Sequence, residues 1–131
     1  MRLLLDTHIA IWAVLDAPML TDHARQLIQN PANEVAVSLA SLWEIAIKNG
    51  LKRSGAGAIG FSVGIAQEAF AAASFDIQPF DIEVLRAVEQ LPHHHGDPFD
   101  RLIVATAETF DYRLMTHDQT LAAYGGHVLI V

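Results

Sequence analysis

The 131-residue chain contains no cysteine. Without cysteine it cannot form a disulfide, a zinc–thiolate site, an iron–sulfur cluster or a cysteine nucleophile. Positive charge is also scarce, because 8 Lys and Arg stand against 15 Asp and Glu, for a formal net charge of −7. This balance argues against a nonspecific cationic nucleic-acid binder.

Long hydrophobic runs are missing as well. No stretch of about 18 apolar residues occurs, so we expect no membrane span. The apolar segment after Arg2 resembles a signal peptide only faintly, because Asp6 and His8 interrupt it and no clean cleavage pattern follows. With 52% hydrophobic and 18% charged residues, the composition is globular rather than disordered. We therefore expect a single cytoplasmic domain over residues 1–131.

Short, continuously apolar segments alternate with helical patterns along the chain. The predicted strands cover residues 1–5, 34–38, 75–79, 113–116 and 127–131. The predicted helices cover 9–15, 22–29, a segment through Trp43 and Ile47 that ends at Asn49 and Gly50, 65–73, 82–91, 98–110 and 118–124. The glycine-containing stretch 51–60 is expected to be a loop. This alternation predicts an α/β fold in which helices cover both faces of a parallel sheet.

Acidic residues gather near the predicted strand-to-helix turns. They are Asp6, Glu44, Asp97, Asp100 and Asp118. In a parallel sheet these turns share one edge, and ligands bind there. Asp97 is the exception, since no clear strand precedes it. Taken singly, each acid also fits a helix cap or first turn. Capping does not require the acids to share an edge, whereas a catalytic site does.

Several carboxylates at one edge repel each other and raise each other's pKa values, so a cation is needed to keep them ionised together. Oxygen ligands without cysteine select a hard ion such as Mg²⁺ or Mn²⁺. Such a site suits phosphodiester hydrolysis, because the metal lowers the pKa of a bound water and stabilises charge on the scissile phosphate.

Four segments of the chain resemble PIN-domain proteins and, more closely, VapC toxins of bacterial type II toxin–antitoxin modules. They are LLLDTH at 3–8, SLWEI at 41–45, DPFDRLIVA at 97–105 and LMTHD at 114–118. The match covers essentially the whole chain in the family's order, and its last two segments are the most specific. The resemblance implies a PIN-like three-layer α/β/α sandwich with a central, mostly parallel sheet.

The resemblance also implies a Mg²⁺- or Mn²⁺-dependent endoribonuclease toxin. Its acidic quartet would be Asp6, Glu44, Asp100 and Asp118, which hold the metal. A metal-activated water would attack the RNA phosphodiester in line and leave a 5′-phosphate and a 3′-hydroxyl. Asp97 is either an accessory metal ligand or a helix cap. A homodimer and a cognate VapB-type antitoxin that blocks the site are implied too.

Two threonines and an arginine within these segments are candidate supporting residues. Thr116 matches the polar residue of the family's last motif and is expected to hold a water or Asp6. Thr7 is expected to be a structural neighbour. Arg101 is expected to pair with a neighbouring carboxylate or with phosphate.

Three of the eight basic residues lie close together: Lys48, Lys52 and Arg53. They form either a phosphate-contact patch or, for Lys48, an ion pair with Glu44 four residues earlier.

Histidine and tryptophan are less informative. The run His93, His94 and His95 is expected to be a solvated loop at the mouth of the site, because imidazole suits softer metals than Mg²⁺. His8 and His117 flank site acids and are read first as local hydrogen-bonding residues, with substrate contact as the alternative. Core or dimer packing is expected for both tryptophans, Trp12 and Trp43.

Two other functions fit parts of the pattern. A phospho-receiver domain also places acids and Mg²⁺ at strand ends, but it needs a lysine at a later strand end. The only two lysines, Lys48 and Lys52, fall in a helix and its exit. A PIN-like module that binds RNA or a partner without cutting is the second alternative, and the complete quartet argues against it.

The acidic charge fits this interpretation, because the five acids listed above are part of the 15 in the chain. Bound divalent ions would offset much of that local charge, so RNA binding should be weak without metal. The empty acidic site would also be complementary to a basic antitoxin segment.

Overall fold

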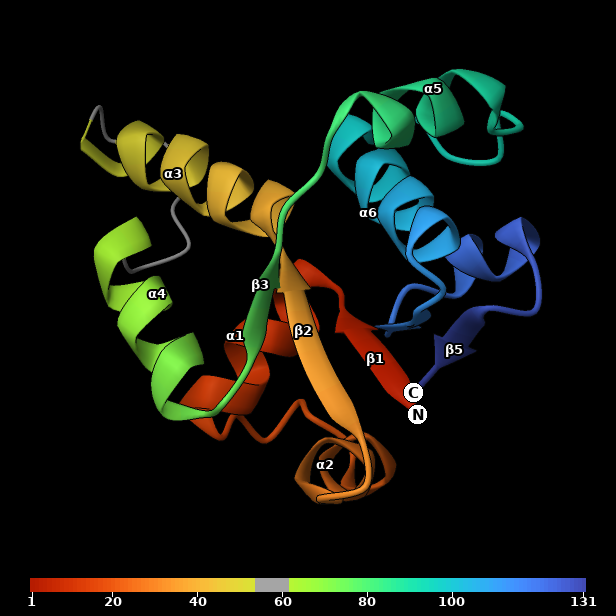
Figure 1. Cartoon of the computed structure of the whole chain (residues 1–131). Helices are drawn as coiled ribbons and strands as arrows, with labels where there is room; N and C mark the ends of the chain where they lie inside the picture. The colour runs from red at the N-terminus through yellow and green to blue at the C-terminus, as the bar shows by residue number, and fades with distance from the viewer. Residues whose placement is uncertain (54–61) are drawn as a thin grey trace.

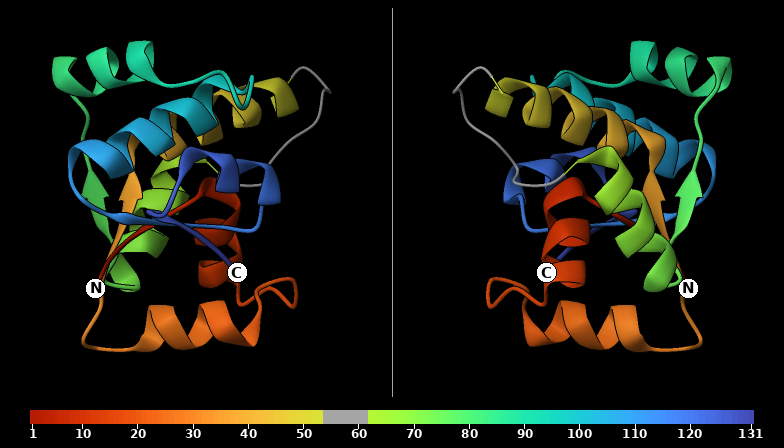
Figure 2. Two further views of the ribbon diagram at one scale, coloured as in Figure 1. Left: turned by 90° about the vertical axis from the view of Figure 1, so that its right-hand side faces the viewer. Right: turned by 90° about the vertical axis from the view of Figure 1, so that its left-hand side faces the viewer.

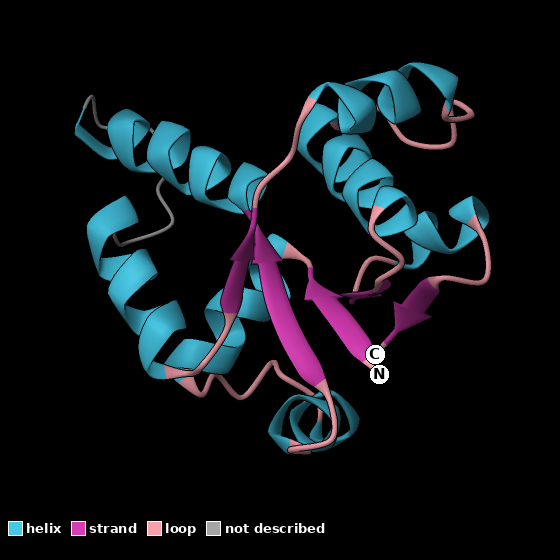
Figure 3. Ribbon diagram, viewed as in Figure 1, coloured by secondary structure: helices cyan, strands magenta, loops and turns pink. Residues whose placement is uncertain are grey.

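The computed structural model describes residues 1–53 and 62–131, except for the side chains of residues 51–53. Its centre is a five-stranded sheet with the order β3-β2-β1-β4-β5 (Figures 1 and 3). The strands are β1 (Arg2–Leu5), β2 (Glu34–Ser38), β3 (Asp76–Gln78), β4 (Arg113–Thr116) and β5 (Val128–Ile130). Every pairing is parallel, so the predicted, mostly parallel sheet is confirmed.

Helices cover both faces of this sheet, which confirms the three-layer α/β/α architecture (Figure 2). The helices are α1 (Thr7–Leu15), α2 (Asp22–Gln29), α3 (Leu39–Arg53), α4 (Val63–Ala72), α5 (Ile82–Gln90), α6 (Pro98–Thr109) and the 3₁₀ helix η1 (Gln119–Tyr124). None of the helices in the described residues is long and apolar enough to cross a membrane.

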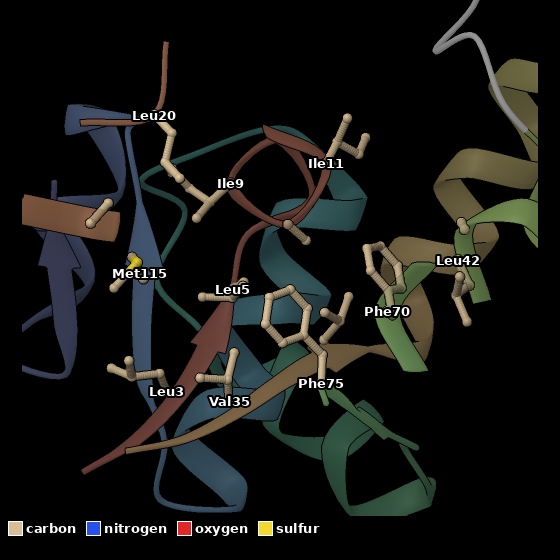
Figure 4. Packing of buried hydrophobic residues seen from close by; sticks show 14 of the residues in the cluster. Leu3, Leu5, Ile9, Ile11, Leu20, Val35, Leu42, Phe70, Phe75 and Met115 are labelled. Carbon is tan, nitrogen blue, oxygen red and sulfur yellow. The ribbon is translucent and has the colours of Figure 1, made fainter. Parts of the chain in front are cut away.

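The strands are continuously apolar because both faces of the sheet are buried. Leu3 and Leu5 point to one face and pack with residues of α1, α2 and α4 (Figure 4). Leu4 lies between them in sequence and points to the other face, where it packs with α5, α6 and η1. All three leucines are fully buried. The alternation of side chains along a strand thus turns one apolar run into two separate cores.

Several predicted element boundaries and one predicted helix type are wrong. The helix expected to end at Asn49 and Gly50 continues to Arg53, because Gly50 keeps a helical conformation and does not adopt the positive φ of a terminating glycine. The first helix begins at Thr7 rather than at residue 9, since Asp6 caps it directly. The short helix after Asp118 is a 3₁₀ helix. The loop expected at 51–60 falls mostly outside the described residues.

The strand order places one pair of strands at a turning point in the chain. From β1 the chain moves outward to β2 and β3, then returns to the other side of β1 to form β4 and β5. The order therefore reverses between β1 and β4. In open parallel sheets, ligands bind at the carboxyl ends of the two strands that flank such a switch point.

Candidate active site

Asp6 lies at the carboxyl end of β1, directly at the switch point. It is 7% exposed and is also the N-cap of α1. Its Oδ1 accepts a hydrogen bond of 2.6 Å from the backbone N–H of Thr7. Its Oδ2 accepts a hydrogen bond of 2.6 Å from the hydroxyl of Thr116, the last residue of β4. Asp6 is thus held in place by groups from both sides of the switch point.

Thr116 connects two of the predicted site acids. While its hydroxyl donates to Asp6, the same Oγ1 accepts the backbone N–H of Asp118 at 3.1 Å. The contact expected between Thr116 and Asp6 is therefore present. Thr7 supports the site from the other side, because its hydroxyl donates to Ser41 Oγ at 2.8 Å and so ties α1 to α3.

Glu44 enters the site from α3, one turn after Ser41, and its side chain is 5% exposed. Lys48 Nζ donates to Glu44 Oε2 at 2.7 Å, which is the expected ion pair across one helical turn. The other carboxylate oxygen, Oε1, is buried and has no hydrogen-bond partner among the described residues. A buried acceptor without a donor is costly, so this oxygen is suited to a cation or a bound water.

Asp97 and Asp100 open α6, whose first turn approaches the same edge. Asp97 Oδ1 accepts the backbone N–H groups of Phe99 at 2.8 Å and of Asp100 at 3.2 Å. Asp97 therefore caps α6 in the structure. Its other carboxylate oxygen takes no part in the cap, so an additional role as an accessory metal ligand stays a prediction. Pro98 follows the cap at the first helical position, where its missing N–H costs nothing.

His95 brings Asp100 and Asp118 together. Its Nε2 lies 2.8 Å from Asp100 Oδ2 and 3.8 Å from Asp118 Oδ2. One ligand atom from each of these three residues lies within 4.8 Å of the others. Of the three consecutive histidines, His93 and His94 are exposed as expected, whereas His95 lies in the site.

The expectation that the whole histidine run is solvated is therefore wrong at one position. The sequence signal that could have found His95 is its position before Gly96, Asp97 and Pro98. A tight entry into α6 brings His95 to the first helical turn, where its ring contacts Asp100.

Two carboxyl groups of the site, those of Asp6 and Asp100, have raised pKa values. Burial raises the pKa of Asp6, and the negative charge of Glu44 adds to the rise, although the hydrogen bond from Thr116 opposes it. Burial, followed by the charges of Asp6 and Asp97, raises the pKa of Asp100 to about 7. Mutual repulsion of this kind is expected where carboxylates share a site without a cation.

Asp118 has the opposite shift. Its Oδ1 accepts from the hydroxyl of Thr120 at 2.6 Å and from the backbone N–H of Thr120 at 2.9 Å. The hydroxyl hydrogen bond is the main reason why the pKa of Asp118 is lowered. Asp118 thus ionises more readily than Asp6 and Asp100, and Asp100 is held partly protonated near neutral pH.

Arg101 does not take the partner expected from the sequence. Its side chain points away from the acids, and it is 9% exposed. It donates to the carbonyls of Pro92 at 3.0 Å and Val88 at 3.2 Å, and to the Tyr124 hydroxyl at 3.2 Å. The predicted pairing with a carboxylate or phosphate is therefore wrong. Arg101 instead satisfies carbonyls at the end of α5 and fixes the segment that carries His95.

The basic cluster is only partly described. Lys48 forms the ion pair given above, and a phosphate contact by its Nζ remains a prediction. The side chains of Lys52 and Arg53 lie outside the described residues, although the backbone of both belongs to α3.

The donor set fits a hard divalent cation. It consists of carboxylate oxygens from four segments, one of them a buried oxygen without a donor, and one imidazole nitrogen. Mg²⁺ and Mn²⁺ both take carboxylate oxygens, and Mn²⁺ accepts an imidazole more readily than Mg²⁺ does. His95 was not expected from the sequence as part of this set.

Replacing Thr116 with Val is expected to reduce, by about 10- to 100-fold, the RNA cleavage that the family resemblance implies, because it releases Asp6 and Asp118 while keeping a β-branched side chain in β4. The buried Asp6 Oδ2 also loses its donor, so the free energy of unfolding should fall by about 1–3 kcal/mol. Cleavage kinetics and urea unfolding measure the two effects. Thr106→Val is the matched control, because Thr106 is also buried but donates only to the Leu102 carbonyl in α6.

Comparison with known proteins agrees with this geometry. A family model described as PIN domain matches residues 3–126. The crystal structure of VapBC2 from Rickettsia felis bound to a promoter DNA fragment is 17% identical, with a TM-score of 0.68, over 100% of this chain and 98% of that chain.

Two further solved structures share the fold. A toxin–antitoxin complex from Klebsiella pneumoniae is 22% identical, with a TM-score of 0.62, over 96% of this chain and 94% of that one. VapBC-1 from nontypeable Haemophilus influenzae is 16% identical, with a TM-score of 0.64, over 94% of each chain. No curated protein matches significantly.

Proposed function

Because this chain belongs to the PIN domain family, we propose that it is a metal-dependent endoribonuclease of the VapC toxin type. The observation that carries the proposal is the convergence of acids from separate segments at the switch point between β1 and β4. Asp6, Glu44, Asp100 and Asp118 are the proposed catalytic and metal-holding residues. The similarity to three toxin–antitoxin structures supports the proposal.

Mg²⁺ or Mn²⁺ is the proposed cofactor. Asp6, Glu44, Asp100 and Asp118 would hold it, with His95 as a further donor and Asp97 as an accessory ligand. When bound, the ion would acidify a nearby water and stabilise negative charge on the scissile phosphate. Neutralising the acids also removes the repulsion that RNA would meet at this edge.

The protein groups around the acids have positioning roles in this proposal. Thr116 holds Asp6 and Asp118 in a fixed relation, and Thr7 anchors the start of α1 against α3. Lys48 forms an ion pair with Glu44 Oε2 and is half-buried, from where its Nζ would reach a phosphate. Lys52 and Arg53 would add further phosphate contacts. Without metal Asp100 is partly protonated near neutral pH, so binding of the cation would displace that proton.

The decisive experiment is cleavage of a panel of structured RNAs with Mg²⁺ or with EDTA. We expect the wild-type protein to cut with Mg²⁺ only, and Asp6→Asn to cut nothing measurable. Asp22→Asn on α2 is the matched control, since it makes the same charge change away from the site and should cut normally. A wild-type protein that cuts no RNA with metal, or an Asp6→Asn variant that cuts equally well, would contradict the proposal.

One of the two alternative functions, the phospho-receiver domain, loses support. Both lysines belong to α3, and Lys48 contacts Glu44, whereas a phospho-receiver domain needs a lysine at a strand end. The match to the PIN domain model over residues 3–126 also argues against a phospho-receiver domain. A module that binds RNA without cutting would give no cleavage in the experiment above.

A VapB-type antitoxin and a homodimer are the proposed protein partners, in the cytoplasm. An acidic site in a chain of net charge −7 favours a basic antitoxin segment. Exposed apolar side chains of Leu39, Trp43 and Ile47 on α3 support self-association, and Trp43 also packs edge-on against Phe99 at 4.8 Å. Light scattering of the purified protein tests the dimer, and a monomer at every concentration would contradict it.

A further inference from the structure

A second feature adjoins the acids beside α1 and the end of β4. It is a pocket of about 250 Å³ lined by Asp6, His8, Trp12, His117 and Asp118. Two of these residues are proposed site acids, and the other three are aromatic. We call this second group, His8, Trp12 and His117, the aromatic wall. The pocket therefore continues from the acids onto a surface of rings.

The aromatic wall is built from two segments that the switch point brings together. His8 and Trp12 are one helical turn apart on α1, with ring centroids 6.0 Å apart and planes tilted by 46°. His117 follows β4, and its ring meets the Trp12 ring edge-on at a centroid distance of 5.7 Å. Trp12 packs against the core below, which holds its ring in place. His8 and His117 are exposed.

The orientation of His117 is fixed by one hydrogen bond. Its Nδ1 lies 2.9 Å from the Val131 carbonyl oxygen. A carbonyl only accepts, so Nδ1 carries the hydrogen, and Nε2 of the neutral ring is an acceptor. Within the described residues Nε2 has no hydrogen-bond partner. The wall thus offers flat ring surfaces together with one acceptor that can receive an N–H group.

We propose that the aromatic wall is a nucleobase subsite, which binds the base of the nucleotide next to the scissile phosphate. This inference rests on the proposed ribonuclease function. The phosphate lies at the acids, the base stacks on the rings, and His117 Nε2 accepts an N–H from the edge of the base. Proteins recognise single-stranded RNA mainly through aromatic stacking and contacts to base edges. The wall would then determine which nucleotide lies beside the cut.

Ring stacking can be measured without cleavage. The chain has two tryptophans, so Trp43→Phe leaves Trp12 as the sole fluorescent reporter. In a Trp43→Phe background with Mg²⁺, a ribonucleoside monophosphate, which has no internucleotide bond that could be cut, should quench Trp12 fluorescence. His8→Ala should weaken that binding roughly tenfold, within the range seen for lost stacking on one base. His8→Phe should restore it, because the ring rather than its charge makes the contact.

His23→Ala is the matched control, since His23 is an exposed histidine on α2 outside the pocket. Its binding and quenching should equal those of the background protein. Melting temperatures of all variants show whether a loss of binding reflects unfolding. Absence of quenching, or equal binding by His8→Ala, overturns the subsite whether or not RNA is cut.

Cleavage separates the failure of the subsite from the failure of the function. In an RNA whose cut position has been mapped, an abasic nucleotide beside the cut should lower kcat/KM for the wild-type protein. For the His8→Ala variant, the same abasic nucleotide should lower kcat/KM only slightly, because the stacking contact between ring and base is already lost. If the wild-type protein cuts, but the loss from the abasic nucleotide and the loss from His8→Ala multiply as independent effects, the subsite is wrong and the nuclease function stands. If the wild-type protein cuts no RNA, the function itself fails.

Discussion

Asp100→Asn is expected to abolish RNA cleavage and, without divalent metal, to make the protein more stable. The loss of cleavage should be roughly a thousandfold or more, because a carboxylate at the reacting centre becomes a neutral amide. The gain in stability follows from the pKa of about 7, which shows that the folded protein resists the charge on Asp100. Asn keeps a similar shape and can still bond to His95 while removing that charge.

The size of the gain depends on pH. At pH 8 Asp100 is ionised in both the folded and the unfolded protein, and only the folded state suffers the repulsion. Allowing for solvent screening, we expect a gain on the order of 1–2 kcal/mol, or a rise in Tm of roughly 5 °C. Below the unfolded pKa, near 4, Asp100 is protonated in both the folded and the unfolded protein, so the difference in stability should nearly vanish there. A variant less stable than the wild-type protein at pH 8 in EDTA would contradict this account.

Mg²⁺ is expected to stabilise the wild-type protein strongly at pH 8 and weakly at pH 5.5. A carboxyl whose folded pKa is raised destabilises the folded state as the pH rises from its unfolded value, near 4, to about 7. Asp6 is shifted in the same direction by burial. The metal-free protein should therefore lose stability over this range, and a bound cation should restore it. Near pH 7 metal binding must also release a proton from Asp100.

Asp118 has the opposite effect on the free energy of unfolding. Because its pKa is lowered in the folded protein, it stabilises the fold above its unfolded pKa, and this stabilisation is lost only in acid. It should not reverse the trend between pH 5.5 and 8. Thermal melts with Mg²⁺ and with EDTA across this range test the stability. Calorimetry in buffers of different ionisation enthalpy tests the released proton. An equal effect of Mg²⁺ at both pH values, or no release, would show that Asp100 does not hold the metal.

The sequence predicted the sheet well because both faces of each strand are buried. A run such as Leu3–Leu5 is apolar at every position, and this pattern is typical of a central parallel strand. It also located the acids, since Asp6 and Asp118 directly follow strands. The order of the strands, and hence the switch point, depends on pairing between residues far apart in the chain. Local patterns do not contain that information.

Side-chain partners were harder to predict than positions. Arg101 follows a site acid in sequence, but on a helix consecutive residues point in different directions, so it is buried against carbonyls instead. His95 was set aside as part of a polar run, yet a single tight entry into α6 brings it to Asp100. In both cases the outcome depends on a turn of the backbone rather than on the type of residue.

The bond between Thr116 and Asp6 joins residues 110 positions apart, which has a consequence for the timing of synthesis. Closing so long a loop is slow, and a chain made from its N-terminus carries Asp6 and Glu44 well before β4 exists. Until β4 pairs with β1, Asp6 lacks Thr116, and Asp118 is not at the same edge. If the chain cuts RNA as proposed, a growing chain should therefore be inert towards RNA until the last strands are in place.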